Sequence, residues 1–270
     1  MSKTARAVNL LAVVLPPVVI AVAIVVFWND VVGLHDLALL LAMYLITGFG
    51  VTVGFHRMLT HRAFRTSRPV EYLFAAAGSM AVQGPVINWV ADHRKHHAHT
   101  GWLFETHGQA DWKRYAKELY EDPVMKKINR LFPLWAFLSL AVPTLLGWAL
   151  HGFTLEGALR GLVWGGLVRA FFLHHITWSI NSICHFFGRR RFVTTDQSTN
   201  VFWLALPSFG EAWHHNHHAF PRSAFHGLRW YQIDLAGWVI LAMEKLGLVW
   251  DVVRITPERQ AQRRISVGST

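Results

Sequence analysis

The sequence predicts an all-α integral membrane protein, with four transmembrane helices and a cytoplasmic helical cap that holds a histidine-rich site for two metal ions. Three observations lead to this prediction. Of the 270 residues, 53% are hydrophobic, with 13 Trp and 18 Phe, which is far from the composition of an average soluble domain. Long runs without a charged side chain recur along the chain, and three groups of closely spaced histidines lie near the ends of apolar segments.

Four apolar segments are expected to cross the membrane. The runs 10–28, 37–55 and 131–150 contain no charged residue, and each approaches the roughly 20 residues of a transmembrane helix. A fourth run, 161–183, is interrupted only by Arg169 and the pair His174-His175. The first run follows two basic residues, as a secretory signal does, but it is long for a signal and lacks an A-x-A cleavage site. The predicted spans are 8–28, 35–56, 131–150 and 158–183, within a single domain covering 1–270.

The distribution of basic residues predicts the topology. The connections 29–36 and 151–156 contain no Lys or Arg, whereas the other connections are rich in both. The positive-inside rule then places both termini and all three histidine groups on the cytoplasmic side. The membrane is expected to be a bacterial cell membrane. The net charge of +10 is therefore a topology signal and an attraction for anionic lipid headgroups, and it does not indicate nucleic-acid binding.

Three further apolar segments are expected to lie at the membrane interface. Segment 70–90 joins the first two histidine groups, so it cannot cross the membrane once if these groups share a site. It is predicted to be an interfacial helix, and the same reasoning applies to 200–213 before the third group. Segment 228–250 contains four charged residues and is also predicted to be an interfacial helix.

The three histidine groups predict the functional site. They are His56-Arg57-Met58-Leu59-Thr60-His61, His93-Arg94-Lys95-His96-His97 and His214-His215-Asn216-His217-His218. Imidazole is a common ligand of iron, zinc, copper and nickel. In H-x-x-H-H the first histidine lies about 60° from the second and about 40° from the third around a helix, so all three can face one cavity. Two copies of this pattern among 17 histidines are hard to attribute to chance, although a pH-sensing or solvated histidine surface is the alternative. The ligands exceed the needs of one ion, so we expect two.

Two further features bear on this site. His56 and His61 lie about 140° apart around a regular helix, so either the helix unwinds there or the two bind different metals. Asn181 and His185 lie one turn apart near the end of the fourth apolar segment, where polar residues indicate function. Cys184 is the only cysteine, which excludes an intramolecular disulfide and any site built from several cysteines.

These motifs closely resemble those of the membrane-bound fatty acyl desaturases of the stearoyl-CoA (delta-9) type. The resemblance extends over about 41–221 and depends on G-F-H-R-M-L-T-H, D-H-R-K-H-H, N-S-I-C-H and G-E-A-W-H-H-N-H-H-A-F-P. It implies two irons with nine histidine ligands: His56, His61, His93, His96, His97, His185, His214, His217 and His218. Asn181 would reach one iron through water, and His215 is interpreted as a residue behind the ligands or on the surface. Glu211 and Asp92 are candidates to orient histidine N–H groups, or else ordinary helix-end carboxylates.

The resemblance implies oxygen-dependent removal of two hydrogens from neighbouring methylenes of an acyl chain, leaving a cis double bond. Dioxygen would be the co-substrate, and the substrate a fatty acyl thioester or an acyl lipid. The sequence has no flavin, haem or nicotinamide fingerprint, so we expect an external electron donor, a ferredoxin or a cytochrome b5-like protein with its reductase. Basic residues could steer an acidic donor or serve only topology; they are Lys113, Arg114, Lys126 and Lys127.

The chain departs from the family pattern after the second histidine group. Relatives carry an extra stretch with an Asp-Pro-His element, whereas here His97 leads directly through Ala98-His99-Thr100 into Gly101-Trp102-Leu103-Phe104. Acyl-CoA-binding relatives often have Arg where Ala91 stands. These departures leave headgroup recognition and the acyl carrier open, as the sequence also leaves chain length, double-bond position and oligomeric state.

Two other functions remain as alternatives. A histidine-ligated di-iron hydroxylase acting on lipids or alkanes would share the oxidant but usually differs in motif spacing. A transporter of divalent metals would instead place ionisable groups along a path through the bilayer midplane, whereas here the three groups lie at the cytoplasmic ends of apolar segments.

Overall fold

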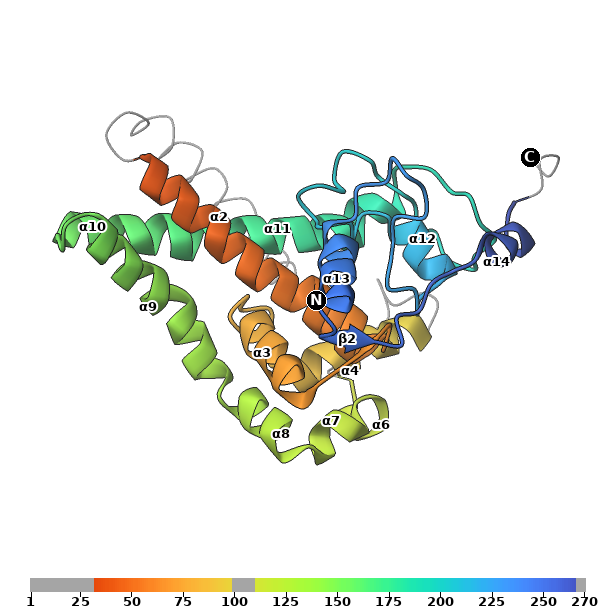
Figure 1. The fold of residues 1–270 in the computed structure, drawn as a ribbon, viewed down its shortest axis with the longest axis horizontal. Helices are drawn as coiled ribbons and strands as arrows, with labels where there is room; N and C mark the ends of the chain where they lie inside the picture. The colour runs from red at the N-terminus through yellow and green to blue at the C-terminus, as the bar shows by residue number, and fades with distance from the viewer. Residues whose placement is uncertain (1–31, 99–109, 266–270) are drawn as a thin grey trace, which may run out of the picture. The chain divides into compact units, whose positions relative to one another are not determined.

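The computed structural model describes residues 32–98 and 110–265, and nearly all regular structure in these ranges is helical, as predicted (Figure 1). The exception is a two-stranded antiparallel sheet formed by β1 (Arg65–Thr66) and β2 (Val249–Trp250). The chain divides into two compact units. The described part of one comprises 32–45 and 137–174, and that of the other comprises 46–98, 110–136 and 175–265.

The first unit is built from apolar helices that pack through small residues. It contains the start of α2 (Leu34–Phe49), most of α9 (Phe132–Leu150), α10 (Leu155–Gly161), the π-helix η2 (Leu162–Val168) and the start of α11 (Arg169–Ser182). A Cβ atom at Gly161 would lie 2.1 Å from the Pro143 carbonyl oxygen, so only glycine allows this approach of α9 and α10. Such contacts are typical of helices in membranes. Arg169 is fully buried and donates to the Gly165 and Ser139 carbonyls, which compensates for a charge inside an apolar helix.

Two helices in the described residues are long and apolar enough to cross a membrane, Leu34–Thr60 with 27 residues and Phe132–Leu150 with 19. They correspond to the second and third predicted spans. The first predicted span, 8–28, lies outside the described residues. The fourth, 158–183, falls mainly on consecutive helical elements from Leu155 to Ser182, but it does not meet the same criterion of length and hydropathy. The four-span topology therefore stays a prediction.

The second unit carries the histidine groups. Its elements are the π-helix η1 (Gly50–Thr60), α3 (Arg68–Ser79), α4 (Val86–Ala98), α6 (Trp112–Tyr115), α7 (Lys117–Glu121), α8 (Pro123–Arg130), the 3-10 helix η3 (Ile183–His185), α12 (His214–Ala219), α13 (Leu235–Lys245) and α14 (Pro257–Gln262). Helix α3 packs along η1 (Figure 1). This contact requires glycine, because a Cβ atom at Gly50 would lie 2.3 Å from the backbone nitrogen of Gly78.

The three predicted interfacial helices differ from the structure. Segment 70–90 forms parts of α3 and α4, separated by a turn in which Gly84 has φ 115°, and neither helix reaches the length of a span. The prediction of a helix at 200–213 is wrong, because this segment forms turns, with Phe209 and Gly210 in the left-handed region at φ 58° and 102°. Within 228–250 only α13 is helical, and the Asp234 side chain fixes its start by accepting from the Gly237 backbone N–H.

Candidate metal centre

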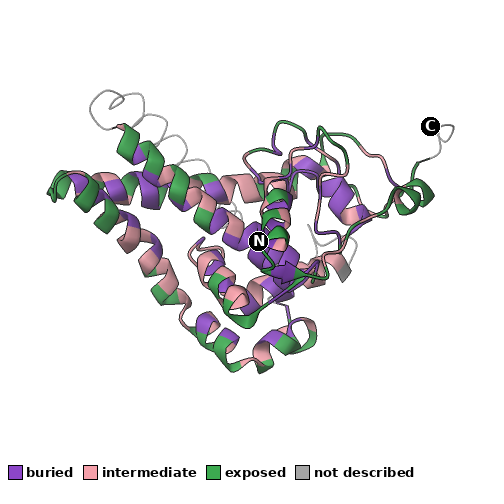
Figure 2. Cartoon of the chain, in the orientation of Figure 1, coloured by how far each residue is buried: buried purple, intermediate pink, exposed green. Residues whose placement is uncertain are grey.

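The π-helix η1 explains how the first histidine group can act together. Its residues are all buried (Figure 2), and the backbone N–H of His61 donates to the His56 carbonyl at 3.1 Å. This i→i+5 bond widens the turn, so residues five apart lie on one face. The ring centroids of His56 and His61 are 4.8 Å apart. Of the two possibilities left open by the sequence, the structure thus shows a departure from the regular helix.

The second group lies on one face of α4, as its spacing predicts. The rings of His93 and His97 have centroids 5.0 Å apart, and Trp89 stacks on His93 with an interplanar angle of 4°. Arg94 joins α4 to the end of η1, since its guanidinium donates to the carbonyls of Leu59 and Thr60 at 2.6 and 3.1 Å. These are carbonyls that the end of a helix leaves without partners, so Arg94 fixes the first two histidine groups relative to each other.

The third group lies on the short helix α12 with His214 and His217 buried. His185 joins it from η3, and its Nε2 lies 3.1 Å from the Nε2 of His214. Next to His185, Cys184 is buried in an apolar cluster with Val201 and Trp213, where it packs as a small apolar side chain. Turns of 200–213 thus carry the core that supports α12.

The nine predicted histidines form two sets of nitrogen donors. The first set, called the five-histidine set below, has donor atoms that all lie within 4.8 Å of one another: His56, His61, His93, His97 and His217. A second set meets the same limit with His96, His185 and His218. His214 adjoins it through His185 and through His218, at a centroid distance of 4.3 Å; these four are called the four-histidine set.

The spacing and state of these nitrogens fit metal ions. Nε2 of His217 lies 3.2 Å from that of His56 and 3.1 Å from that of His97. Two nitrogens each about 2.1 Å from one ion stand about 3 Å apart, so a shared ion accounts for these distances. Three buried ring nitrogens also have no hydrogen-bond partner among the described residues: Nε2 of His61, of His93 and of His218. Buried polar atoms without partners are costly, and a metal ion would satisfy them.

A buried charge network orients His56. Its Nδ1 lies 2.6 Å from Glu211 Oε2, a distance typical of a charge-assisted hydrogen bond, so its Nε2 faces the other donors. The fully buried Arg57 donates to Glu211 and to Asp234, at 2.9 and 2.8 Å from Nη2. Burial alone would raise the pKa of Glu211, but attraction to His226, Arg57 and His56 holds it well below its usual range. The prediction that Glu211 contacts a histidine is confirmed.

A second carboxylate serves the four-histidine set. Asp196 Oδ2 lies 3.0 Å from Nδ1 of His218, which leaves the buried Nε2 of His218 for a ligand. Burial would raise the pKa of Asp196, but hydrogen bonds from His218 and Ser198 lower it below its usual range. Each donor set therefore has a histidine whose other nitrogen contacts an ionised carboxylate, an arrangement that typically tunes metal ligands.

Burial favours the neutral form, which is the form that binds metal, in six of these imidazoles. It lowers the pKa of His96 to about 3 and that of His97 to about 2, with further lowering by neighbouring histidines. The same causes place four other pKa values well below the usual range, those of His61, His93, His214 and His217.

Sequence reasoning missed His226, Asp196 and the pairing of Arg57. His226 is fully buried, 3.3 Å from Glu211 through Nδ1, and within 4.8 Å of His56 and Glu211 donor atoms. A lone histidine in Phe225-His226-Gly227 and a lone aspartate in Thr195-Asp196-Gln197 carry no spacing signal. For Arg57, the one available signal was its position next to His56 in the chain.

Three other predicted residues have different outcomes. His215 is fully buried, which excludes a place on the surface and leaves the alternative of a residue behind the ligands; its Nε2 accepts from the Phe192 backbone N–H. Asp92 accepts from the Ala110 backbone N–H at 2.8 Å, which supports a role in local backbone structure. Asn181 lies on α11 four residues before His185, and its contact through water stays a prediction.

Comparison with known proteins decides the family. No family model matches the chain, but individual proteins are similar over most of its length. A hex-5-enoyl-[acyl-carrier protein] acetylenase from Moorena producens (strain JHB) is 41% identical over 269 residues, covering 88% of this chain and 83% of the relative. An sn-1 stearoyl-lipid 9-desaturase from Anabaena variabilis is 38% identical over 236 residues, covering 78% and 82%. Delta-9 acyl-lipid desaturase 1 from Arabidopsis thaliana is 38% identical over 238 residues, covering 84% and 78%.

The chain belongs to the membrane fatty acyl desaturase family. The predicted resemblance is therefore confirmed, and this desaturase is an oxidoreductase of lipid metabolism that acts on fatty acyl chains. Its histidine sets, with their carboxylate partners, fit a metal cofactor. The departure after His97 falls on 99–109, outside the described residues.

Proposed function

We propose that the desaturase uses two irons and dioxygen to introduce a cis double bond into a saturated acyl chain, at the delta-9 position. One iron would be held by the five-histidine set and the other by the four-histidine set, with Asn181 near the second iron through water. The convergence of nine imidazoles from η1, α4, η3 and α12 carries this proposal. With dioxygen, bound iron supplies an oxidant able to remove hydrogen from an unactivated methylene, which no side chain can do.

The chain's own residues prepare the donor atoms. Glu211 and Asp196 keep the Nδ1 protons of His56 and His218 in place, so the Nε2 lone pairs face the cluster. Trp89 stacks on His93 and limits rotation of that ring. Arg94 holds α4 against the end of η1. These contacts fix the orientation of the donor atoms, as tight metal sites require.

Membrane placement and partners complete the proposal. We propose a single desaturase domain in a bacterial cell membrane, with four spans and with both termini and the active site on the cytoplasmic side. The substrate would be an acyl thioester or an acyl lipid, as the names of different relatives describe. A ferredoxin, or a cytochrome b5-like protein with its reductase, would supply electrons. The side chains of Lys113, Arg114 and Lys127 are exposed and are available to attract an acidic donor.

Product analysis tests the proposal directly. The protein is expressed in cells that lack delta-9 desaturases, and their fatty acids are identified by gas chromatography and mass spectrometry, with iron measured on the purified protein. We expect about two irons per chain and a cis-delta-9 alkene, both reduced in His217→Ala and retained in His35→Gln, where an exposed histidine outside the cluster is changed. A hydroxylated product without a new alkene would refute the proposal, as would exchangeable zinc without any product; an alkyne would favour acetylenase activity.

A further inference from the structure

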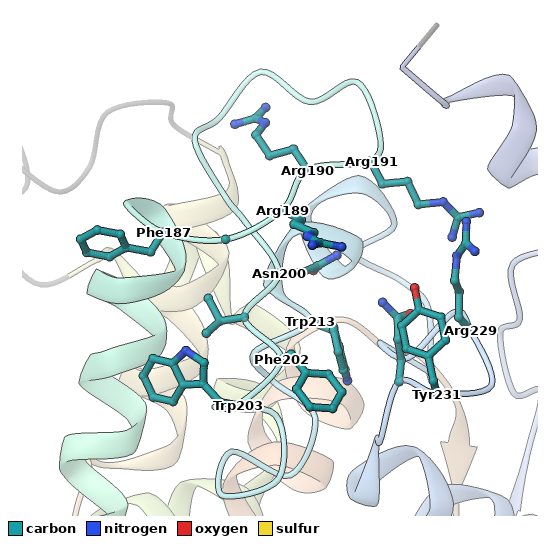
Figure 3. A pocket seen from close by; sticks show the side chains of 13 residues that line it. Phe187, Arg189, Arg190, Arg191, Asn200, Phe202, Trp203, Trp213, Arg229 and Tyr231 are labelled. Atoms are coloured by element: carbon teal, nitrogen blue, oxygen red, sulfur yellow. The ribbon is translucent and has the colours of Figure 1, made fainter. Parts of the chain in front are cut away.

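A basic hollow lies beside the third histidine group, outside the set of nitrogen donors. Its volume is about 760 Å³. Its wall comes from 187–191, 200–203, Trp213, Arg229 and 231–232 (Figure 3). A volume of roughly 300–1,000 Å³ is typical of sites for small molecules. Trp213 directly precedes His214, and Phe187 follows His185 by two residues, so the hollow adjoins the segments that carry the four-histidine set.

Four arginines line this hollow without a carboxylate to balance them. They are Arg189, Arg190, Arg191 and Arg229. None of the four takes part in the ion pairs found among the described residues, and no acidic residue lines the hollow. Elsewhere in the chain Arg57, Arg94 and Arg160 each pair with a carboxylate. The four guanidinium groups therefore give this hollow an excess of positive charge.

Arg191 and Arg229 form its most strongly basic end. Figure 3 shows their guanidinium groups extending toward each other. Nε and Nη1 of Arg191 are shielded from solvent and have no acceptor among the described residues. Burial lowers the pKa of Arg191, and repulsion from Arg229 and Arg264 lowers it further. An anion placed between the two guanidinium groups would relieve this repulsion. Its oxygens would also accept hydrogen bonds from the N–H groups of Arg191 that have no acceptor.

Aromatic side chains also line the hollow, beside the polar Asn200 and Gln232. Three of these aromatic residues are largely exposed to solvent: Phe187 is 70% exposed, Phe202 64% and Trp203 65%. Exposed aromatic residues beside arginines are characteristic of the membrane–water interface, where one end of a ligand is apolar and the other charged. The combination suits an amphiphile that carries a phosphate.

We propose that this hollow binds the phosphate ester of the acyl substrate between Arg191 and Arg229, next to the third histidine group. The acyl part of this inference rests on the proposed desaturase function. Two classes of acyl substrate carry a phosphate ester: a phospholipid has a phosphodiester, and an acyl thioester has a phosphopantetheine arm. A concave site of this volume favours a headgroup over the broad surface of an acidic electron donor.

Headgroup binding is measured on the purified, iron-loaded protein in a neutral detergent. The probes are dihexanoyl-phosphatidylglycerol and coenzyme A, with uncharged dihexanoylglycerol as the reference ligand, and binding is followed by calorimetry. The variant Arg191→Gln/Arg229→Gln is compared with Arg130→Gln/Arg259→Gln, which removes two exposed charges outside the hollow. We expect the first variant to bind at least tenfold more weakly and the second to bind as the unchanged protein does.

The probe that loses affinity identifies the source of the phosphate. Loss for phosphatidylglycerol alone assigns a phospholipid, and loss for coenzyme A alone assigns a phosphopantetheine thioester. Arg191→Lys/Arg229→Lys, which keeps the charges, should recover most of the affinity, and an unchanged circular dichroism spectrum and iron content show that the glutamine variant is folded.

Several results would overturn the inference. These are equal affinities in both double variants, or no binding of either anion by the unchanged protein. Unchanged headgroup binding with slower reduction by a plant-type ferredoxin would instead assign the hollow to a protein donor. Product analysis separates this inference from the proposed function. Binding without any alkene refutes the desaturase proposal alone, whereas alkene formation with an unchanged KM in the glutamine variant refutes the headgroup site alone.

Discussion

Replacing Glu211 by Gln should weaken metal binding at the five-histidine set and spare the four-histidine set. The carboxylate contacts His56 Nδ1 at 2.6 Å and accepts from Arg57 Nε and Nη2 at 3.1 and 2.9 Å. Glutamine keeps one acceptor oxygen and presents an NH2 group, so one buried donor loses its acceptor. Loss of such a ligand partner typically weakens metal binding 10- to 100-fold, or about 1.4–2.7 kcal/mol.

The fold should also lose stability, because Arg57 keeps only one carboxylate. Removing one member of a buried ion pair costs about 3–5 kcal/mol, and we expect the lower end because Asp234 and the Ala224 carbonyl still bind Arg57. Asp234→Asn is the matched control, since it also removes a partner of Arg57, yet the Asp234 side chain has no contact with a ring of the five-histidine set.

Iron per chain is measured by mass spectrometry after dialysis against graded chelator, together with the Tm. Glu211→Gln should keep one iron at chelator concentrations where the unchanged protein keeps two, and Asp234→Asn should keep two with a similarly lowered Tm. Two irons retained in Glu211→Gln would refute the orienting role of the carboxylate. Equal iron loss in both variants would show that the effect acts through the fold.

Three other changes test the same physical picture. Asp196→Asn should weaken iron binding about 10- to 100-fold at the four-histidine set only, since Asp196 contacts His218; loss of both irons, read by the same dialysis, would contradict this. Gly50→Ala should lower stability by about 1–3 kcal/mol, because its Cβ would meet the α3 backbone at 2.3 Å, whereas Gly33→Ala meets only a side-chain oxygen at 3.5 Å; equal Tm values for both would contradict this. The metal-free protein should lose stability as pH falls below about 6.5, where the unfolded imidazoles bind protons and the buried ones do not. His96, with its pKa lowered to about 3, contributes about 2 kcal/mol of this loss at pH 5, and a denaturant midpoint that stays constant from pH 7.5 to 5 would argue against buried neutral imidazoles.

The histidine sets could be predicted because their spacing carries the information. In H-x-x-H-H, the positions alone place three rings on one helical face, and α4 shows this for His93, His96 and His97. His56 and His61 could not be assigned in the same way, because the rule for a regular helix does not hold in η1. The i→i+5 bond that brings them together is a property of the folded backbone that the side-chain pattern does not show.

The errors at 200–213 and at Asp196 have a common cause. Apolar composition at 200–213 indicated burial correctly, since Val201, Leu204 and Trp213 belong to the core, but it does not distinguish buried turns from a helix. The two carboxylates that orient histidines, Glu211 and Asp196, are single residues that the tertiary fold brings to their partners. Glu211, for example, lies 154 positions along the chain from Arg57, the neighbour of His56. Spacing rules act over a few residues and miss such partners.

The charged residues around the cluster explain why a site made of imidazoles can hold cations. Neutral imidazoles supply electron pairs without any negative charge. The negative charge that balances the metal ions must therefore come from residues that contact the histidines on the side away from the metal. In the buried network around Arg57, two carboxylates face one guanidinium, which leaves a net negative charge beside His56. Asp196 adds another behind His218. Arg57 thus keeps Glu211 and Asp234 ionised and buried, and the excess negative charge that remains is directed at the metal site.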